Sequence, residues 1–136
     1  MKRDLDLVRR ILFRIEESGE GAGASRFTDF VEEGCEVSSI HYHVRLLKDA
    51  GLIDADELVP GQWWPERMTW AGHEFLDAAR NDELWNDVKR QVLQGGGSAP
   101  FALVHELLLE GTRERLRGRG SSRRSRSGRM GKSRKT

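Results

Sequence analysis

Apolar residues recur every three or four positions near the start of the chain, which predicts an amphipathic helix from Asp4 to about Ser18. Its apolar stripe comprises Leu5, Val8, Leu12 and Ile15. Asp4 is a suitable N-cap residue because its carboxylate can accept from the first free backbone N–H groups. The segment from Glu20 to Ala24 has no such period and ends the helix. Alternating side chains between Arg26 and Val31 then predict a short strand.

The strongest helical pattern runs from about Glu36 to Ala50, with one face formed by Val37, Ile40, Val44 and Leu47. Gly51 follows as a residue that readily takes the left-handed conformation at a helix end. An extended segment from Leu52 to about Val59, a turn at Pro60-Gly61 and a second extended segment to about Thr69 predict a two-stranded hairpin with a fairly long tip.

Three further helices are predicted after the hairpin. Thr69 can cap a helix that begins at Trp70 and carries Phe75 and Leu76. Asp82 can cap the next one, whose inward side chains are Leu84, Trp85, Val88 and Val92. The run Gly95–Ser98 breaks the chain, and Pro100 suits the first turn of a final helix with the stripe Phe101, Val104, Leu107 and Leu108.

Charge is distributed unevenly along the 136 residues, although the net charge is only +1. All 22 acidic residues and 15 of the 23 Lys and Arg residues precede Gly118, which gives that part a net charge of −7. The segment from Gly118 to Thr136 carries eight basic residues, no acidic residue and one Met, so we expect it to be disordered when free. The expected divisions are a domain over 1–94, a C-terminal amphipathic helix over 95–117 and a disordered basic tail over 118–136.

Several classes of protein do not fit this sequence. It has no run of about 18 apolar residues, and Asp6 and Arg9 interrupt any apolar segment after the basic N-terminus, so we expect a cytoplasmic protein without a membrane segment. The single cysteine, Cys35, can form neither an internal disulfide nor a cysteine pair for zinc. We expect it to be a small, half-buried residue.

The order helix, short strand, helix and hairpin is that of a winged helix, and the stretch from Ile40 to Ile53 resembles the recognition helix of that superfamily. In the phrase Leu47-Lys48-Asp49-Ala50-Gly51-Leu52-Ile53, Ala and Gly permit a close turn while Leu and Ile anchor the first strand. The expected fold is therefore a mostly helical α+β protein, with a winged helix-turn-helix-like domain, extra C-terminal helices and a disordered basic tail.

A broader resemblance rests on three ordered motifs, MKRDLDLVRRIL, HYHVRLLKDAGLI and RMTWAGHEFLDAARNDELWNDVK. They resemble small bacterial and phage-associated proteins grouped as domain-of-unknown-function family twenty-five thirteen. That resemblance implies the fold and supplies no reaction. The chain departs from the fuller winged-helix pattern because only Glu32 to Cys35 is available for the helix that usually precedes the recognition helix and braces it against phosphates.

Candidate nucleic-acid contacts lie on the predicted recognition helix, opposite its core stripe: Ser38, His41, Tyr42, Arg45 and Asp49. Hydroxyl, imidazole and guanidinium groups can bind base edges and phosphates, although a solvated helix face explains the pattern as well. His41 and His43 lie two positions apart and diverge on a helix, so they do not form a metal pair. His43, at the flank of the core, is expected to be a hydrogen-bonded packing residue.

Two further groups are candidate binding residues. Trp63 and Trp64 lie at or near the hairpin tip, where they either pack in the core or anchor a partner protein. Four tail arginines, Arg123, Arg124, Arg126 and Arg129, are suited to phosphate backbones, with a solubilising role as the alternative. The stretch His73-Glu74 has no adjacent nucleophile, so we expect no catalysis, metal or cofactor.

These patterns favour a winged-helix DNA-binding or regulatory protein of phage or prophage type. In this interpretation the basic tail adds electrostatic attraction to the phosphate backbone. The alternative is a protein–protein adaptor that uses the hairpin tryptophans or the last helix, as a monomer or as a homodimer, without binding DNA. The acidic body favours the adaptor, and the recognition-helix resemblance favours DNA.

Overall fold

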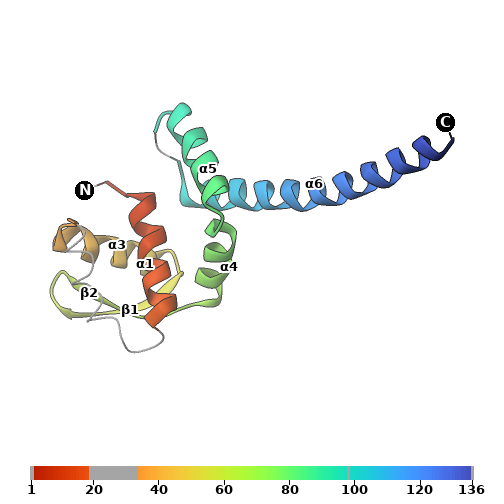
Figure 1. The fold of residues 1–136 in the computed structure, drawn as a ribbon. Coiled ribbons are helices and arrows are strands. Elements are labelled where there is room, and N and C mark those ends of the chain that lie inside the picture. Colours follow the sequence, from red (N-terminus) through yellow and green to blue (C-terminus); the bar gives the residue numbers. More distant parts are fainter. Residues whose placement is uncertain (1, 19–33, 98, 136) are drawn as a thin grey trace. The chain divides into compact units, whose positions relative to one another are not determined.

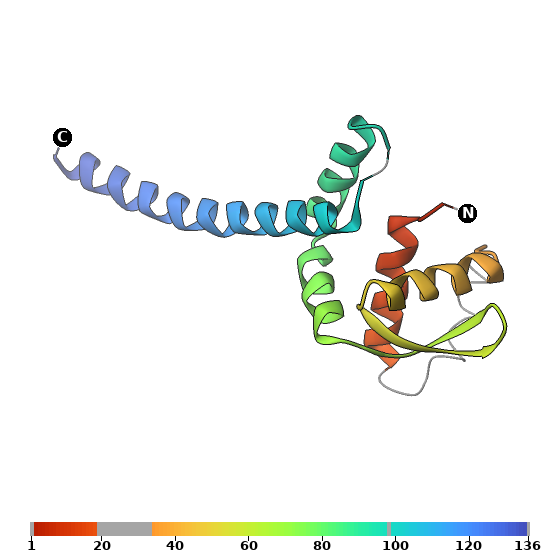
Figure 2. The ribbon, with the colours of Figure 1, turned by 180° about the vertical axis from the view of Figure 1, so that it is seen from behind.

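The computed structural model describes residues 2–18, 34–97 and 99–135, with the side chains of 119–135 left undescribed. Its elements in chain order are α1 (Leu5–Ser18), α3 (Val37–Asp49), β1 (Ile53–Val59), β2 (Gln62–Met68), α4 (Trp70–Ala79), α5 (Asp82–Gln94) and α6 (Phe101–Lys135). Figures 1 and 2 show these five helices and the two-stranded sheet from opposite sides. The chain is therefore a mostly helical α+β protein, as predicted. It divides into two compact units, residues 1–77 and 78–136.

Helix α1 begins where the sequence predicted, because the Asp4 carboxylate accepts from the backbone N–H groups of Asp6 (3.0 Å) and Leu7 (3.3 Å). Its buried side chains are Leu7, Val8, Ile11, Leu12 and Ile15. This face is wider than the predicted stripe, and Leu5 is only half-buried. The reason is that α1 packs against both α3 and β2, so two neighbours cover it.

Helix α3 is preceded by Glu36 and followed by Ala50, in agreement with the prediction. Gly51 takes a φ of 78°, and the Leu52 N–H donates to the Leu47 carbonyl (3.0 Å), which closes the helix end. Leu52 and Ile53 are buried and anchor β1. The strand predicted at Arg26–Val31 lies outside the described residues, as do Glu32 and Glu33 of the segment Glu32–Cys35.

Strands β1 and β2 form the predicted antiparallel hairpin, paired from Ile53↔Met68 to Val59↔Gln62. The tip is shorter than expected, because the pairing leaves only Pro60 and Gly61 between the strands. Gly61 has a φ of 80°, which suits the third position of a type II turn after proline. Two irregularities interrupt the register: Glu66 is an extra residue in β2, and Leu58 is an extra residue in β1.

Gly72 lets α4 lie directly against the turn between α3 and β1. A Cβ atom at Gly72 would lie 2.0 Å from the Leu52 carbonyl oxygen and 2.5 Å from a Met68 side-chain carbon. Thr69 fixes the same junction, since its hydroxyl donates to the Gly51 carbonyl (2.6 Å) and accepts from the Gly72 N–H (3.2 Å). The predicted cap at Thr69 is confirmed.

The second unit pairs α5 with α6. Its α5 helix is capped by Asn81, whose side chain accepts from the Leu84 N–H (2.9 Å), and not by Asp82 as predicted. The inward residues of α5 are those predicted: Leu84, Trp85, Val88 and Val92. In α6, Val104 and Leu108 are fully buried, and Gly111 lies so close to Leu84 that a Cβ atom there would collide with it.

The backbone of α6 is helical through Lys135, where the sequence predicted a disordered tail from Gly118 onward. Propagating a helix that is already formed costs less than nucleating one, and arginine is a good helix former. The helical extension of a preformed α6 is consistent with both effects. The side chains of the four candidate tail arginines lie outside the described residues.

The contact at Gly72 predicts a specific loss of stability. Gly72→Ala should lower the free energy of unfolding by about 1–3 kcal/mol, because the obstructing Leu52 oxygen is backbone and cannot swing aside. Gly118→Ala is the control, because a Cβ atom there meets nothing within 4 Å in a helix. Urea denaturation of both variants checks this, and a Gly72→Ala midpoint equal to that of Gly118→Ala would contradict it.

Candidate functional site

Two histidines widen the buried side of α3 beyond its apolar stripe. His43 is completely buried, and its Nδ1 lies 2.7 Å from the Ser39 carbonyl oxygen. Since a carbonyl only accepts, Nδ1 carries the proton, and Nε2 is free to accept from the Asp4 backbone N–H at 2.8 Å. His43 thus ties α3 to the start of α1, and the prediction of a hydrogen-bonded packing residue is confirmed.

His41 lies on the other flank of the stripe and is only 5% exposed. Its Nδ1 lies 3.0 Å from the Trp63 amide nitrogen and 2.9 Å from the Trp63 carbonyl oxygen, so either tautomer finds a partner. The imidazole also meets the Trp64 ring edge to face, with centroids 5.1 Å apart. The prediction that His41 faces solvent is therefore wrong. A helical wheel places His41 outside the apolar face of α3, but strand β2 packs on that side of the helix and covers the ring.

The two tryptophans are both half-buried and hold the hairpin against α3. Trp63 contacts His41 through its backbone, and the Lys48 ammonium lies 5.2 Å from its ring centroid. Trp64 packs on the His41 ring. Of the two alternatives left open by the sequence, these contacts favour packing between hairpin and helix, with part of each ring exposed.

The outward face of α3 carries most of the helix's candidate nucleic-acid contacts. Ser38 is exposed and Tyr42 is half-exposed. The Arg45 Nε lies 3.8 Å from the Asp49 carboxylate, and both side chains are more than half exposed, so this surface ion pair holds Arg45 weakly. Among the described residues, no three or more His, Cys, Asp or Glu side chains are placed to hold a metal ion together.

The exposed side of the hairpin is acidic with an apolar tip. Asp54 is paired with Arg67 at 2.7 Å, whereas Asp56, Glu57 and Glu66 point to solvent. A hydrogen bond to Asp56 and the negative charge of Asp56 raise the pKa of Glu66. At the tip, Leu58 is 69% exposed and Val59 50% exposed. The bulge at Leu58 removes it from the paired register and places it at the solvent-facing tip.

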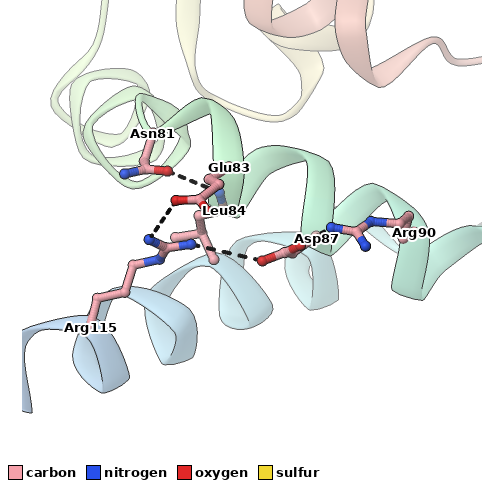
Figure 3. Close-up of polar contacts among 6 residues, drawn as sticks. All are labelled: Asn81, Glu83, Leu84, Asp87, Arg90 and Arg115. Carbon is pink, nitrogen blue, oxygen red and sulfur yellow. Dashed lines mark hydrogen bonds and ion pairs between the residues drawn. The ribbon is translucent and has the colours of Figure 1, made fainter. Parts of the chain in front are cut away.

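The second unit contains a groove between α5 and α6. This groove of about 400 Å³ is lined by Leu84, Asp87, Gln91, Leu107, Glu110, Gly111, Glu114 and Arg115. Figure 3 shows how Arg115 reaches from α6 to Glu83 (3.3 Å) and Asp87 (3.8 Å) on α5, while Asp87 also contacts Arg90. The two ion pairs of Arg115 link α6 to α5, whereas the Asp87–Arg90 pair lies within α5.

Cys35 is half-buried, as predicted, and its sulfur lies 3.8 Å from the Arg10 guanidinium. No helix in the described part of the chain combines the length and the apolar character that crossing a bilayer needs.

The carboxyl pair in the hairpin predicts a dependence on pH. The folded-state pKa of Glu66 is raised, so its contribution to stability is present below about 4.3, the ordinary pKa of glutamate, and is lost as pH rises through the raised value. Glu66→Gln should therefore raise the melting temperature at pH 7 and leave it unchanged near pH 4.

Glu74→Gln, which removes one exposed carboxylate from α4, controls for the change in net charge. Thermal melts of both variants across pH 4–8 test the assignment. An equal gain for Glu66→Gln and Glu74→Gln at pH 7 would show that net charge alone, and not the contact with Asp56, is responsible.

Comparison with known proteins bears on the first 98 residues. The model of a family described as a hypothetical protein (DUF2513) matches residues 2–98. An uncharacterized protein of Haemophilus influenzae (strain ATCC 51907 / DSM 11121 / KW20 / Rd) is 38% identical over 95 residues, which cover 68% of this chain and 79% of that protein. No solved structure matches the chain.

Proposed function

Since the chain belongs to the DUF2513 family, whose description assigns no activity, we propose that it is a non-catalytic, cytoplasmic binding protein with a winged-helix arrangement in residues 1–77. What supports this arrangement is the order of α1, α3 and the β1–β2 hairpin, with α3 packed against α1 and both strands. The short strand predicted between α1 and α3, at Arg26–Val31, lies outside the described residues.

The hairpin tip is the surface through which the protein acts, and its ligand is another protein. Leu58 and Val59 are exposed side by side, next to the solvent-facing carboxylates of Asp56 and Glu57. Apolar side chains at the centre of a surface with a polar rim are typical of protein interfaces. The exposed Leu58 is the observation that supports this proposal most directly.

Electrostatics weighs against DNA as the ligand of the hairpin. Residues 53–68 contain four acidic residues and one basic residue, and that basic residue, Arg67, is already paired with Asp54. A wing that approaches a phosphate backbone with such a charge meets repulsion instead of releasing counterions. The adaptor interpretation is therefore favoured over the DNA-binding one.

DNA binding is the second candidate function, supported by a different set of residues. Ser38, Tyr42 and Arg45 line the outward side of α3, and the eight basic residues after Arg117 offer a sequence-independent contact to phosphates. Arg45 is available because its ion pair with Asp49 is long and exposed.

The adaptor proposal predicts that the hairpin tip is required for a protein partner. In nuclease-treated lysate, wild-type protein should retain a partner that Leu58→Ser loses, because the serine removes apolar contact area at the centre of the surface. Leu93→Ser is the matched control, since Leu93 is 72% exposed on α5. Equal capture by all three proteins would contradict the proposal.

The basic tail should account for any binding to DNA. With labelled duplex at physiological salt, we expect the full chain to cause a salt-sensitive mobility shift, and the chain ending at Arg117 to cause none. Arg45→Ala should not change the shift. A loss of about 1–3 kcal/mol in Arg45→Ala, together with a shift by the shortened chain, would replace the adaptor by the DNA-binding function.

A further inference from the structure

Helix α4 has a sharply divided surface. Its buried side chains, Phe75, Leu76, Ala78 and Ala79, lie with Gly72 on one side of the helix. The exposed side carries Trp70, His73, Glu74 and Asp77, at positions i, i+3, i+4 and i+7. We call these four residues the Trp70 face. Three of them are polar, as expected for a helix face exposed to solvent, whereas Trp70 is a large aromatic residue.

Trp70 contributes little to the packing of its own unit. It is 79% exposed, the largest exposed fraction among the large apolar side chains of the described residues. The helix start does not depend on it either, because Thr69 supplies the cap and Gly72 the close approach. A tryptophan offers up to about 250 Å² for burial, and tryptophan is the side chain most enriched among interface residues that dominate binding energy.

The surroundings of the ring define the chemistry of its partner. Glu74 lies one helical turn from Trp70, and Asp77 lies one turn further on the same face. The face of an indole ring attracts cations, and the carboxylates beside it attract the same groups. Residues 1–77 carry nine basic and sixteen acidic residues, so the longer-range field of this unit also favours a cationic partner.

We propose that the Trp70 face binds an arginine-rich segment of a partner protein, with a guanidinium stacked on the indole and held by the carboxylate of Glu74. Arginine suits this site better than lysine, because its planar group stacks on the ring while its donors reach a carboxylate. This surface is separate from the hairpin tip, and the proposal does not depend on the proposed function.

Two other occupants fit the face less well. Nucleic acid would bring phosphates against Glu74 and Asp77, and a base stacked on Trp70 would have to overcome that repulsion. An apolar homodimer centred on this face would need about 800 Å² from each copy, whereas Trp70 is the one apolar side chain among the four.

The test measures the fluorescence anisotropy of a labelled peptide of eight arginines titrated with the full chain. Wild-type protein should bind it, with an affinity that falls as salt is added. Trp70→Leu and Glu74→Lys should each weaken binding about three- to tenfold, whereas Trp70→Phe should retain part of the affinity because it keeps an aromatic face. Leu58→Ser is the control and should bind like wild type, since the hairpin tip is a different surface.

Each outcome decides the proposal. A Trp70→Leu variant that binds as tightly as wild type would show that the ring is not used, and an unchanged Glu74→Lys variant would show attraction to the whole acidic unit only. Tighter binding of a single-stranded oligonucleotide than of the peptide, weakened by Trp70→Leu, would replace the protein partner by nucleic acid. Light scattering that shows a wild-type dimer and a Trp70→Leu monomer would assign the face to self-association and overturn the proposal.

Discussion

The packing of α3 against α1 and both strands is the constraint on which the rest of the first unit depends. Ile40, Val44 and Leu47 of its apolar stripe are buried in the core, whereas Val37 is exposed. His43 binds the backbone of Asp4 at the start of α1, and His41 binds the backbone of β2. A buried imidazole without partners would destabilise the fold. Here His43 is satisfied by the Asp4 N–H and by the Ser39 carbonyl of its own helix, and His41 by the backbone of Trp63. The His41 contacts fix the hairpin against the helix.

That constraint explains which parts of the molecule the sequence predicted. The periods of α1, α3 and α5 and the turn at Pro60-Gly61 are local signals, and they predicted the elements and most of their bounds. The position of His41 could not be predicted in this way, because it depends on which element covers the flank of α3. The same reason applies to the wide buried face of α1. At α5 the cap lies one residue earlier than predicted, at Asn81, since both Asn81 and Asp82 have side chains able to cap.

The candidate site was predicted less well than the fold. Of the five residues expected on the outward side of α3, His41 is buried, and the other four are there: Ser38, Tyr42, Arg45 and Asp49. The surface features that matter most in the proposals, Leu58 and Trp70, carry no sequence motif. Leu58 is exposed because a bulge removes it from the strand register, and Trp70 because α4 uses its opposite side to approach Leu52. An apolar residue in a short element is ordinarily assigned to the core, so such exposures emerge only from the three-dimensional arrangement.

Leu58 and Trp70, the exposed apolar residues on which the two proposals rest, share one electrostatic setting. Leu58 lies next to Glu57 in sequence, and Trp70 is followed one turn later by Glu74, so each apolar contact is available only to a partner that tolerates nearby carboxylates. Under the two proposals, the apolar group supplies affinity while the carboxylates discriminate against acidic proteins and phosphates. A DNA-reading domain needs the opposite arrangement, with basic residues around its contact surface. Eight of the 23 Lys and Arg residues lie instead in the acid-free segment after Arg117, which separates any attraction to polyanions from the surfaces that select a partner.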